Sequence, residues 1–139
     1  MDNFNEIEQN WNTFEKLCKT LEEPGVDNLL AEMGERLIMC PASNTKEQPG
    51  CCPGGLIQHA LDVTATMRKI NNALNLGLNT KSVLKVGLLH DIGKVGDQTR
   101  DYFIEQDSDW HREKLGQFYK YNQELEKMSV SHRSLYLLQ

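Results

Sequence analysis

Two separate segments of the sequence place histidine and aspartate among apolar residues. His59 lies in an apolar stretch with helical spacing, and the pair His90-Asp91 closes another. A buried imidazole needs a hydrogen-bond partner or a metal ion, and a buried carboxylate needs a cation even more. The three side chains could share a divalent ion. Neighbouring helix residues diverge by about 100°, so His90 and Asp91 would approach the ion from different sides, and Asp91 could bridge two ions. The alternative for His59 alone is a core histidine that bonds a backbone carbonyl.

The segments that carry these residues are predicted to be helices. Apolar residues recur at steps of three and four through most of the chain, which is typical of amphipathic helices. The predicted helices cover residues 4–21, 26–39, 56–76, 80–92, 111–126 and 131–139. Pro41 and Gly77 mark the ends of the second and third helices. The proline- and glycine-rich stretch 41–55 is predicted to be a loop.

The apolar positions of the first four helices define the expected core. The residues expected to face inward are Phe4, Ile7, Trp11, Phe14, Leu17, Leu21, Val26, Leu29, Leu30, Met33, Leu37, Leu56, Ala60, Val63, Met67, Ile70, Leu74, Val83, Leu84, Val86, Leu88 and Leu89. No strand alternation or hairpin signal appears, although residues 102–104 could form a short helix or strand. We expect one all-α domain over residues 1–139, with a helical pair (1–40), a loop (41–55) and the helices of the metal site (56–139).

Length and composition restrict the class of protein. The chain has 139 residues with 15 basic and 20 acidic side chains, a net charge of −5, and 39% hydrophobic residues. These values are typical of one globular domain and exclude a disordered tail or a membrane bundle. No apolar stretch approaches the roughly 20 residues of a membrane span, and residues 1–20 lack a secretion signal. We expect a cytoplasmic protein without a membrane partner.

Acidic residues are concentrated at the start of the chain. Residues 1–35 carry nine acidic and two basic side chains, and the remaining residues are slightly basic. A slightly basic second part suits a phosphate-bearing substrate, but it is too weak for a long contact with a nucleic-acid duplex.

The four cysteines follow no metal-binding or disulfide pattern. Cys18, Cys40, Cys51 and Cys52 show no CxxC spacing, and adjacent cysteines make a poor disulfide framework. We expect reduced thiols. A zinc site that combines Cys40, Cys51 and Cys52 with a histidine is the alternative.

The segments around the histidines resemble a known family. Residues 53–59 read PGGLIQH and residues 87–94 read GLLHDIGK. Both resemble the HD-domain superfamily of metal-dependent phosphohydrolases, whose signature is a histidine, a His-Asp pair about one helix pair later and a distal aspartate. The first segment is most similar to the branch that includes 3′–5′ exoribonucleases, and WHREKLG (110–116) and HRSL (132–135) are similar to small HD proteins of large bacteriophages. The resemblance covers about residues 40–139 and implies an all-α HD-like domain.

The resemblance implies roles for particular residues. It implies that His59, His90 and Asp91 bind a metal ion, and that Asp91 and Lys94 are catalytic, with Lys94 at the substrate phosphate. Further candidates are His132 and His111 as ligands of a second ion, and Arg112 and Arg133 as substrate contacts. A solvent-exposed helix position is the alternative for His111 and for both arginines.

The chain departs from the family pattern at two places. Cys51 and Cys52 stand where some relatives have a histidine, and thiolates favour softer metals. The last aspartate ligand of the family should lie beyond residues 132–135, and this sequence stops at Gln139. We therefore expect either a truncated chain or an incomplete site.

The resemblance implies a metal-dependent phosphohydrolase or phosphodiesterase that acts on a nucleotide or oligonucleotide phosphate ester. Imidazole and carboxylate ligands favour Mn, Fe, Co, Ni or Zn over Mg, with one or two ions per chain. A bound ion lowers the pKa of water from 15.7 towards roughly 7 and polarises a phosphoryl oxygen, and Lys94 would offset charge on the non-bridging oxygens. The aromatic candidates for stacking on a base, with core packing as the alternative, are Trp110, Phe118, Tyr119 and Tyr121.

Two other functions are compatible with the sequence. One is an HD-like module that binds a nucleotide without cleaving it. The other is a helical bacteriophage protein that binds a host protein through its acidic first helix.

Overall fold

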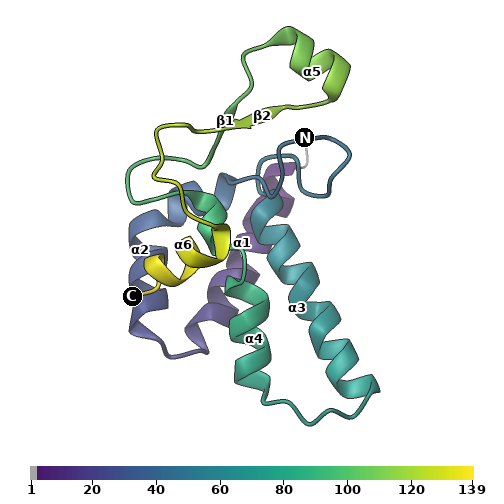
Figure 1. Ribbon diagram of the computed structural model, residues 1–139. Helices are drawn as coiled ribbons and strands as arrows, with labels where there is room; N and C mark the ends of the chain where they lie inside the picture. Colours follow the sequence, from purple (N-terminus) through teal and green to yellow (C-terminus); the bar gives the residue numbers. More distant parts are fainter. Residues whose placement is uncertain (1–2) are drawn as a thin grey trace.

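Helices account for most of the chain. The computed structural model describes residues 3–139. Its elements, labelled in Figure 1, are α1 (Asn3–Lys19), α2 (Pro24–Met39), α3 (Gly55–Ala73), α4 (Thr80–Leu89), the 3₁₀ turn η1 (Ile92–Val95), β1 (Phe103–Glu105), α5 (Asp109–Leu115), β2 (Tyr119–Tyr121) and α6 (Val130–Leu137). The predicted all-α fold class is confirmed. No helix among the described residues has the length and apolar character that a membrane crossing requires.

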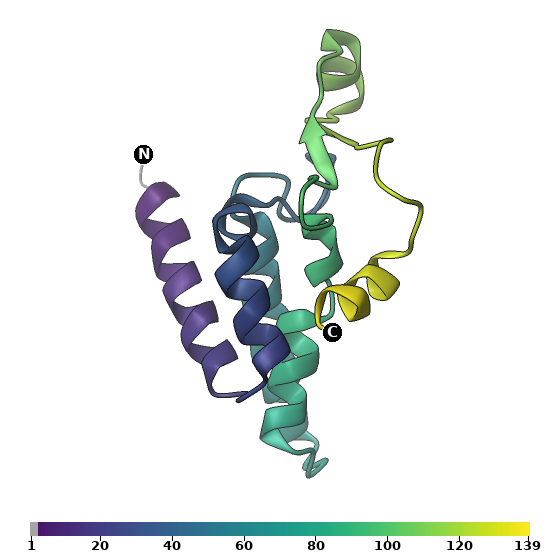
Figure 2. The same cartoon turned by 90° about the vertical axis from the view of Figure 1, so that its left-hand side faces the viewer.

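Four long helices form the body of the molecule. α1 and α2 pack against each other and against α3, while α3 and α4 run antiparallel and meet at a turn (Figures 1 and 2). α6 packs on η1, which follows α4 directly. The strands β1 and β2 carry α5 away from the body, at the end opposite to the α3–α4 turn.

The prediction for the second helix is confirmed at every core position. The buried residues of α2 are Val26, Leu29, Leu30, Met33 and Leu37. Pro24 stands in the first turn, where its missing N–H has no intrahelical partner to lose. The helix ends at Met39, before Pro41, as the proline predicts. These side chains join those of α1, α3 and α4 in one core that includes Phe14, Leu21, Leu56 and Leu88.

Four residues expected in the core are exposed. Phe4 is 74% exposed at the start of α1, Val86 is exposed on α4, and Ile70 and Leu74 are 47% and 65% exposed near the end of α3. The first half of α3 is covered, whereas its second half extends with α4 beyond the body (Figure 1). Periodicity identified the apolar face of this helix correctly, but the face continues past the elements that could cover it.

The helix predicted over residues 111–126 is wrong beyond its first residues. α5 stops at Leu115 because Gly116 adopts a left-handed conformation, with φ 65°. The chain then forms β2, which pairs antiparallel with β1 in the register Phe103↔Tyr121, Ile104↔Lys120 and Glu105↔Tyr119. Each strand has three residues, which is too short for alternation to be visible in the sequence. The short strand allowed for residues 102–104 is confirmed by β1, which begins at Phe103.

Candidate metal centre

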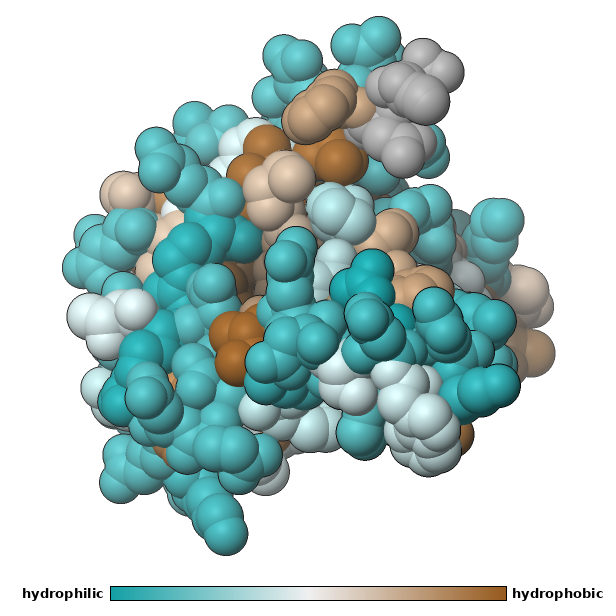
Figure 3. All heavy atoms as spheres, turned by 90° about the horizontal axis from the view of Figure 1, so that it is seen from above, coloured by the Kyte–Doolittle hydropathy of each residue, from teal (hydrophilic) through white to brown (hydrophobic). Residues whose placement is uncertain are grey.

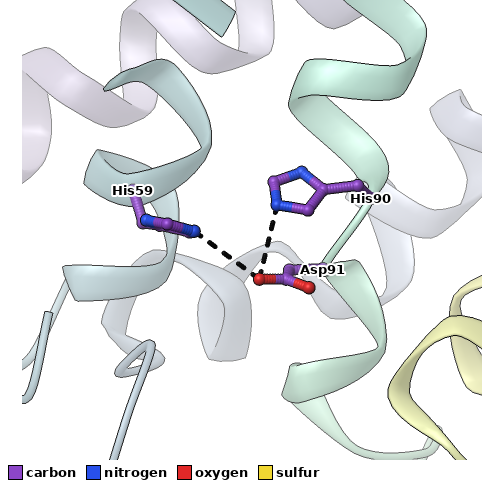
Figure 4. A group of neighbouring side chains, drawn as sticks. All are labelled: His59, His90 and Asp91. Carbon is purple, nitrogen blue, oxygen red and sulfur yellow. Dashed lines mark ion pairs between the residues drawn. The ribbon is translucent and has the colours of Figure 1, made fainter. Parts of the chain in front are cut away.

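Three elements deliver His59, His90 and Asp91 to one place. His59 lies in the second turn of α3, and His90 is the C-terminal cap of α4. Asp91 follows immediately and precedes η1. Figure 4 shows the two imidazole rings approaching the Asp91 carboxylate from opposite helices. The site therefore depends on how closely α3 and α4 pack.

A small residue makes this close packing possible. Gly87 faces Thr64 across the α3–α4 interface, and a Cβ at position 87 would lie 2.4 Å from Thr64 Oγ1 and 2.9 Å from Thr64 Cα. The glycine thus lets the two backbones approach one turn away from the histidines. The rings of His59 and His90 consequently lie with their centroids 5.7 Å apart.

The donor atoms of the three side chains fit a single divalent ion. His59 Nε2 lies 3.6 Å and His90 Nε2 lies 3.4 Å from Asp91 Oδ2. One ligand atom from each residue falls within 4.8 Å of the other two, and this is the one such group of histidine, cysteine and acidic residues found in the part of the chain that the structure describes. Ligand atoms about 2.05 Å from a tetrahedral ion are separated by about 3.3 Å. Three protein donors also leave coordination positions open, as catalytic metal sites require.

The hydrogen bonding of His90 favours metal ligation through Nε2. Its Nδ1 lies 3.0 Å from the carbonyl oxygen of Gly87, which can only accept a hydrogen bond. Nδ1 therefore carries the proton in the neutral ring, and Nε2 presents its lone pair towards Asp91. A backbone carbonyl on the far nitrogen is the usual support of a metal-binding histidine.

Lys94 completes the cluster with a positive charge. Its Nζ lies 3.3 Å from Asp91 Oδ2 and donates a 2.8 Å hydrogen bond to the carbonyl oxygen of Ala42. The side chains of the histidines, Asp91 and Lys94 are between 23% and 34% exposed. The cluster is thus partly buried, but a ligand from solvent can reach it.

The turn that carries Asp91 and Lys94 is fixed by α6. Ser134 Oγ accepts a 2.8 Å hydrogen bond from the backbone N–H of Gly93 and donates one to the carbonyl oxygen of Val130. A Cβ at Gly93 would lie 2.3 Å from the Val130 carbonyl oxygen, so α6 and η1 are in direct backbone contact. Sequence reasoning missed these supporting residues, together with the Ala42 carbonyl. The glycines within GLLHDIGK were the available signal for close packing.

The two other candidate histidines lie outside the cluster. His111 is on α5, where Nδ1 lies 2.7 Å from Ser108 Oγ, and it contributes to a separate cavity under that helix. His132 is exposed on the first turn of α6. Neither belongs to the ligand group formed by the described residues, so the structure gives no support to a second ion held by them.

The two candidate arginines are also elsewhere. Arg112 lies on α5 with its guanidinium 5.6 Å from the centre of the Phe118 ring. Arg133 is only 3% exposed, stacks on Tyr102 and donates to the carbonyl oxygen of Glu126. The solvated helix face considered for Arg133 is therefore wrong, because the side chain packs inward beneath the segment that precedes α6.

The cysteines do not form a metal site in the described residues. Cys40 Sγ lies 3.4 Å from the carbonyl oxygen of Lys94 and packs in the core, while Cys51 is partly exposed and Cys52 is exposed. No cysteine joins a ligand group there. The alternative of a zinc site built on Cys40, Cys51 and Cys52 is not supported.

Comparison with known proteins agrees with this geometry. Residues 56–134 match the HD domain family. The match covers more than half of the chain and spans all three members of the cluster, so the chain belongs to the HD domain family. Proteins of this family are generally hydrolases that bind divalent metal ions. Neither the curated proteins nor the solved structures contained a match to the chain.

Proposed function

We propose that the protein is a metal-dependent phosphohydrolase that cleaves a phosphate ester of a nucleotide or oligonucleotide. The observation that carries the proposal is the convergence of His59 Nε2, His90 Nε2 and an Asp91 carboxylate oxygen within 4.8 Å. The segment GGLIQH, which carries His59, also resembles the exoribonuclease-like branch of the family, and this supports a phosphodiester substrate.

The chain would hold one divalent ion between the two imidazoles and the carboxylate. A divalent ion supplies Lewis acidity, which activates water and polarises a phosphoryl oxygen. The donor set favours Mn, Fe, Co, Ni or Zn over Mg, because imidazole nitrogen is a poor ligand for magnesium. The Gly87 carbonyl keeps His90 in the tautomer that ligation needs.

Lys94 would bind the phosphoryl group of the substrate. Its ammonium lies at the edge of the cluster and is held there by Ala42 as well as by Asp91. A positive charge at this place stabilises negative charge that develops on the non-bridging oxygens. Phosphoryl transfer needs mainly positioning and electrostatic stabilisation, so no nucleophilic side chain is required.

Hydrolysis of a chromogenic phosphodiester tests the proposal. The full chain is freed of metal with a chelator, reloaded with Mn, Fe, Co, Ni, Zn or Mg, and assayed with bis(nitrophenyl) phosphate. We expect turnover with at least one transition metal and its loss in His59→Ala. His132→Ala also removes an imidazole but lies outside the cluster, and it should retain activity. An absence of metal-dependent turnover, or equal activity in His59→Ala, would contradict the proposal.

A further inference from the structure

A second concave site lies under α5, away from the metal cluster. A cavity of about 850 Å³, broadly open to solvent, lies between the β1–β2 pair, α5 and the segment around Asn44. Its volume falls in the range of about 300–1,000 Å³ that is typical of small-molecule sites. His59, His90, Asp91 and Lys94 do not line it. The upper face of the molecule, which carries α5, is predominantly hydrophilic (Figure 3).

A buried amide with a free donor lines this cavity. Gln106 is only 8% exposed, and its Oε1 accepts a 3.1 Å hydrogen bond from the Ser108 backbone. Its Nε2 makes no hydrogen bond to any residue that the structure describes. Among the described residues, Arg133 Nη1 is the one side-chain N or O atom that is both fully buried and without a hydrogen bond. Gln106 Nε2 also lacks a hydrogen bond but is not fully buried, so it keeps some accessible surface, and Gln106 lines the cavity. Gln106 Nε2 can therefore donate a hydrogen bond to water or to a ligand in the cavity, from an amide whose position is fixed by Ser108.

Three further polar groups in the lining have unused hydrogen-bonding capacity. Asn44 and Gln117 use only backbone atoms, since the Asn44 carbonyl accepts from Phe118 and Tyr119 and the Gln117 N–H donates to the His111 carbonyl. Their side-chain amides bond to none of the described residues. His111 engages Ser108 through Nδ1, which leaves Nε2 free. Amide side chains offer a donor and an acceptor in one plane, which suits the edge of a planar heterocycle.

Aromatic side chains stand beside these amides. Tyr121 is 45% exposed, while it packs against Tyr102 and Phe103, with ring centroids 5.0 and 5.8 Å apart. Tyr119 also lines the cavity, and burial, followed by the nearby Cys51, raises the pKa of its hydroxyl, which therefore stays a donor at neutral pH. Aromatic rings next to polar groups are how proteins hold unpaired bases.

The charge of the cavity disfavours a strongly anionic ligand. Lys120 in the lining is already paired with Asp107 at 3.0 Å, and Glu124 is the acidic residue of the lining. A ligand that matches this site is therefore uncharged, planar and supplied with both donors and acceptors.

From these observations we infer that the cavity under α5 binds a nucleobase, and that free nucleosides are ligands of the protein. The amides of Gln106, Gln117 and Asn44 contact the base edge, and Tyr121 offers a ring face for stacking. The inference does not depend on the metal cluster, because nucleosides carry no phosphate and the two sites share no residue.

Titration of the full chain with individual nucleosides tests this site. Adenosine, guanosine, cytidine and uridine are titrated into the protein, and amide chemical shifts are followed by NMR, with ribose and a methyl glucoside as sugar controls. We expect at least one nucleoside to shift resonances of the cavity residues with a Kd in the millimolar range or below. The sugars should not do so.

Matched variants locate the binding. Gln117→Ala keeps every backbone hydrogen bond and should raise the Kd about tenfold, since it removes one of the expected hydrogen bonds to the base. Gln106→Glu keeps the acceptor for Ser108 but lacks the free donor, and should weaken binding similarly. Gln98→Ala, at an exposed glutamine outside the cavity, and His59→Ala should bind like the parent. Absence of binding, equal binding by ribose, an unchanged Kd in Gln117→Ala, or loss of binding in His59→Ala would each overturn the inference.

Discussion

The imidazole of His90 is oriented by the backbone of its own helix. Gly87 lies three residues earlier, so its carbonyl oxygen falls beneath the ring and accepts from Nδ1 at 3.0 Å. No side chain is needed to set the tautomer, and Asp91 remains available to the ion. The same glycine removes the Cβ that would hold α3 away. One residue thus supports both the chemistry of His90 and its distance from His59.

Substitution of Lys94 should lower catalytic activity without lowering metal binding. Lys94→Met keeps an unbranched side chain that is one atom shorter and removes the charge. We expect kcat/KM for a phosphodiester to fall about 100-fold, as for the loss of one group that stabilises transition-state charge. The metal content should not fall, because no donor atom is removed. Lys114→Met, at an exposed lysine on α5, is the matched control. An unchanged kcat/KM, or loss of the metal, would contradict the role given to Lys94.

At the scale of elements, the site is formed where two packing contacts meet. α3 packs on α4 at Thr64 and Gly87, and η1 packs on α6 at Gly93 and Ser134. The first contact sets the distance from His59 to His90. The second fixes the turn that points Asp91 and Lys94 at the same space. The first contact contains no residue of the cluster. The second touches it only at the backbone carbonyl oxygen of His90, which lies 3.4 Å from Ser134 Oγ.

Enlarging Gly87 should push α3 and α4 apart. A Cβ at this position would come within 3.0 Å of three Thr64 atoms, and overpacking of this kind destabilises a protein by about 1–3 kcal/mol. We expect Gly87→Ala to lower the free energy of unfolding by this amount, measured with urea, and to weaken metal binding. Val86→Ala, at the neighbouring exposed position, should change stability by less than about 0.5 kcal/mol. Metal affinity that survives intact in Gly87→Ala would show that the spacing is not critical.

Removing the Ser134 hydroxyl should loosen η1. Ser134 is buried, and without its oxygen the Gly93 N–H loses its acceptor. An unsatisfied buried donor costs about 1–3 kcal/mol, so Ser134→Ala should be less stable by this amount and less active at equal metal loading. Ser131→Ala removes an exposed hydroxyl from the same helix and should do neither. Equal stability of the two variants would rule out this positioning role.

At the scale of the whole molecule, burial in the core keeps two thiols in their protonated form. Burial is the largest cause that raises the pKa of Cys18 from 9.0 to about 12, with further contributions from Asp27 and Glu15. Burial likewise raises the pKa of Cys40 to about 12. Because the unfolded thiols ionise at lower pH, the unfolded state binds fewer protons between these values. The stability of the fold should therefore be complete below about pH 9 and be lost progressively as the pH rises towards 12.

Urea unfolding at increasing pH measures this loss. Each thiol should contribute a slope of about 1.4 kcal/mol per pH unit above pH 9. Cys18→Ala should reduce the slope of the unfolding free energy against pH by the contribution of one thiol. This holds whether or not the substitution changes stability at neutral pH. Cys52→Ala, which changes an exposed thiol, should leave the slope as it is. A slope unaffected by Cys18→Ala would mean that this thiol is not protected by the fold.

The sequence predicted the positions of the helices well, but it predicted the burial of their apolar side chains less well. Every core position of α2 was identified because its apolar face is covered along its whole length. Ile70 and Leu74 follow the same spacing but are exposed, because periodicity records the apolar face of a helix and not the element that covers it. The pairing of β1 with β2 was missed because each strand has three residues and α5 lies between them in the sequence.

The residues of the candidate site that lie close together in the sequence could be predicted, whereas the contacts that distant segments make with them could not. His90, Asp91 and Lys94 lie in one short segment, and His59 was linked to them by an inward helix face and by the family resemblance. The placement of Lys94 against Ala42 and of Ser134 against Gly93 depends on contacts between residues 41 to 52 positions apart. His132 and His111 were candidates because the family resemblance allows ligands of a second ion. Neither joins the ligand group formed by the described residues, since α6 and α5 place their side chains away from it.

The most direct test of the metal centre is anomalous diffraction from crystals of the full chain soaked in Mn²⁺. Data collected at a wavelength where manganese scatters anomalously locate the ion without assumptions about its ligands. We expect one strong anomalous peak within bonding distance of His59 Nε2, His90 Nε2 and an Asp91 carboxylate oxygen. Ordered crystals with no peak at this place, or with manganese bound only elsewhere, would contradict it.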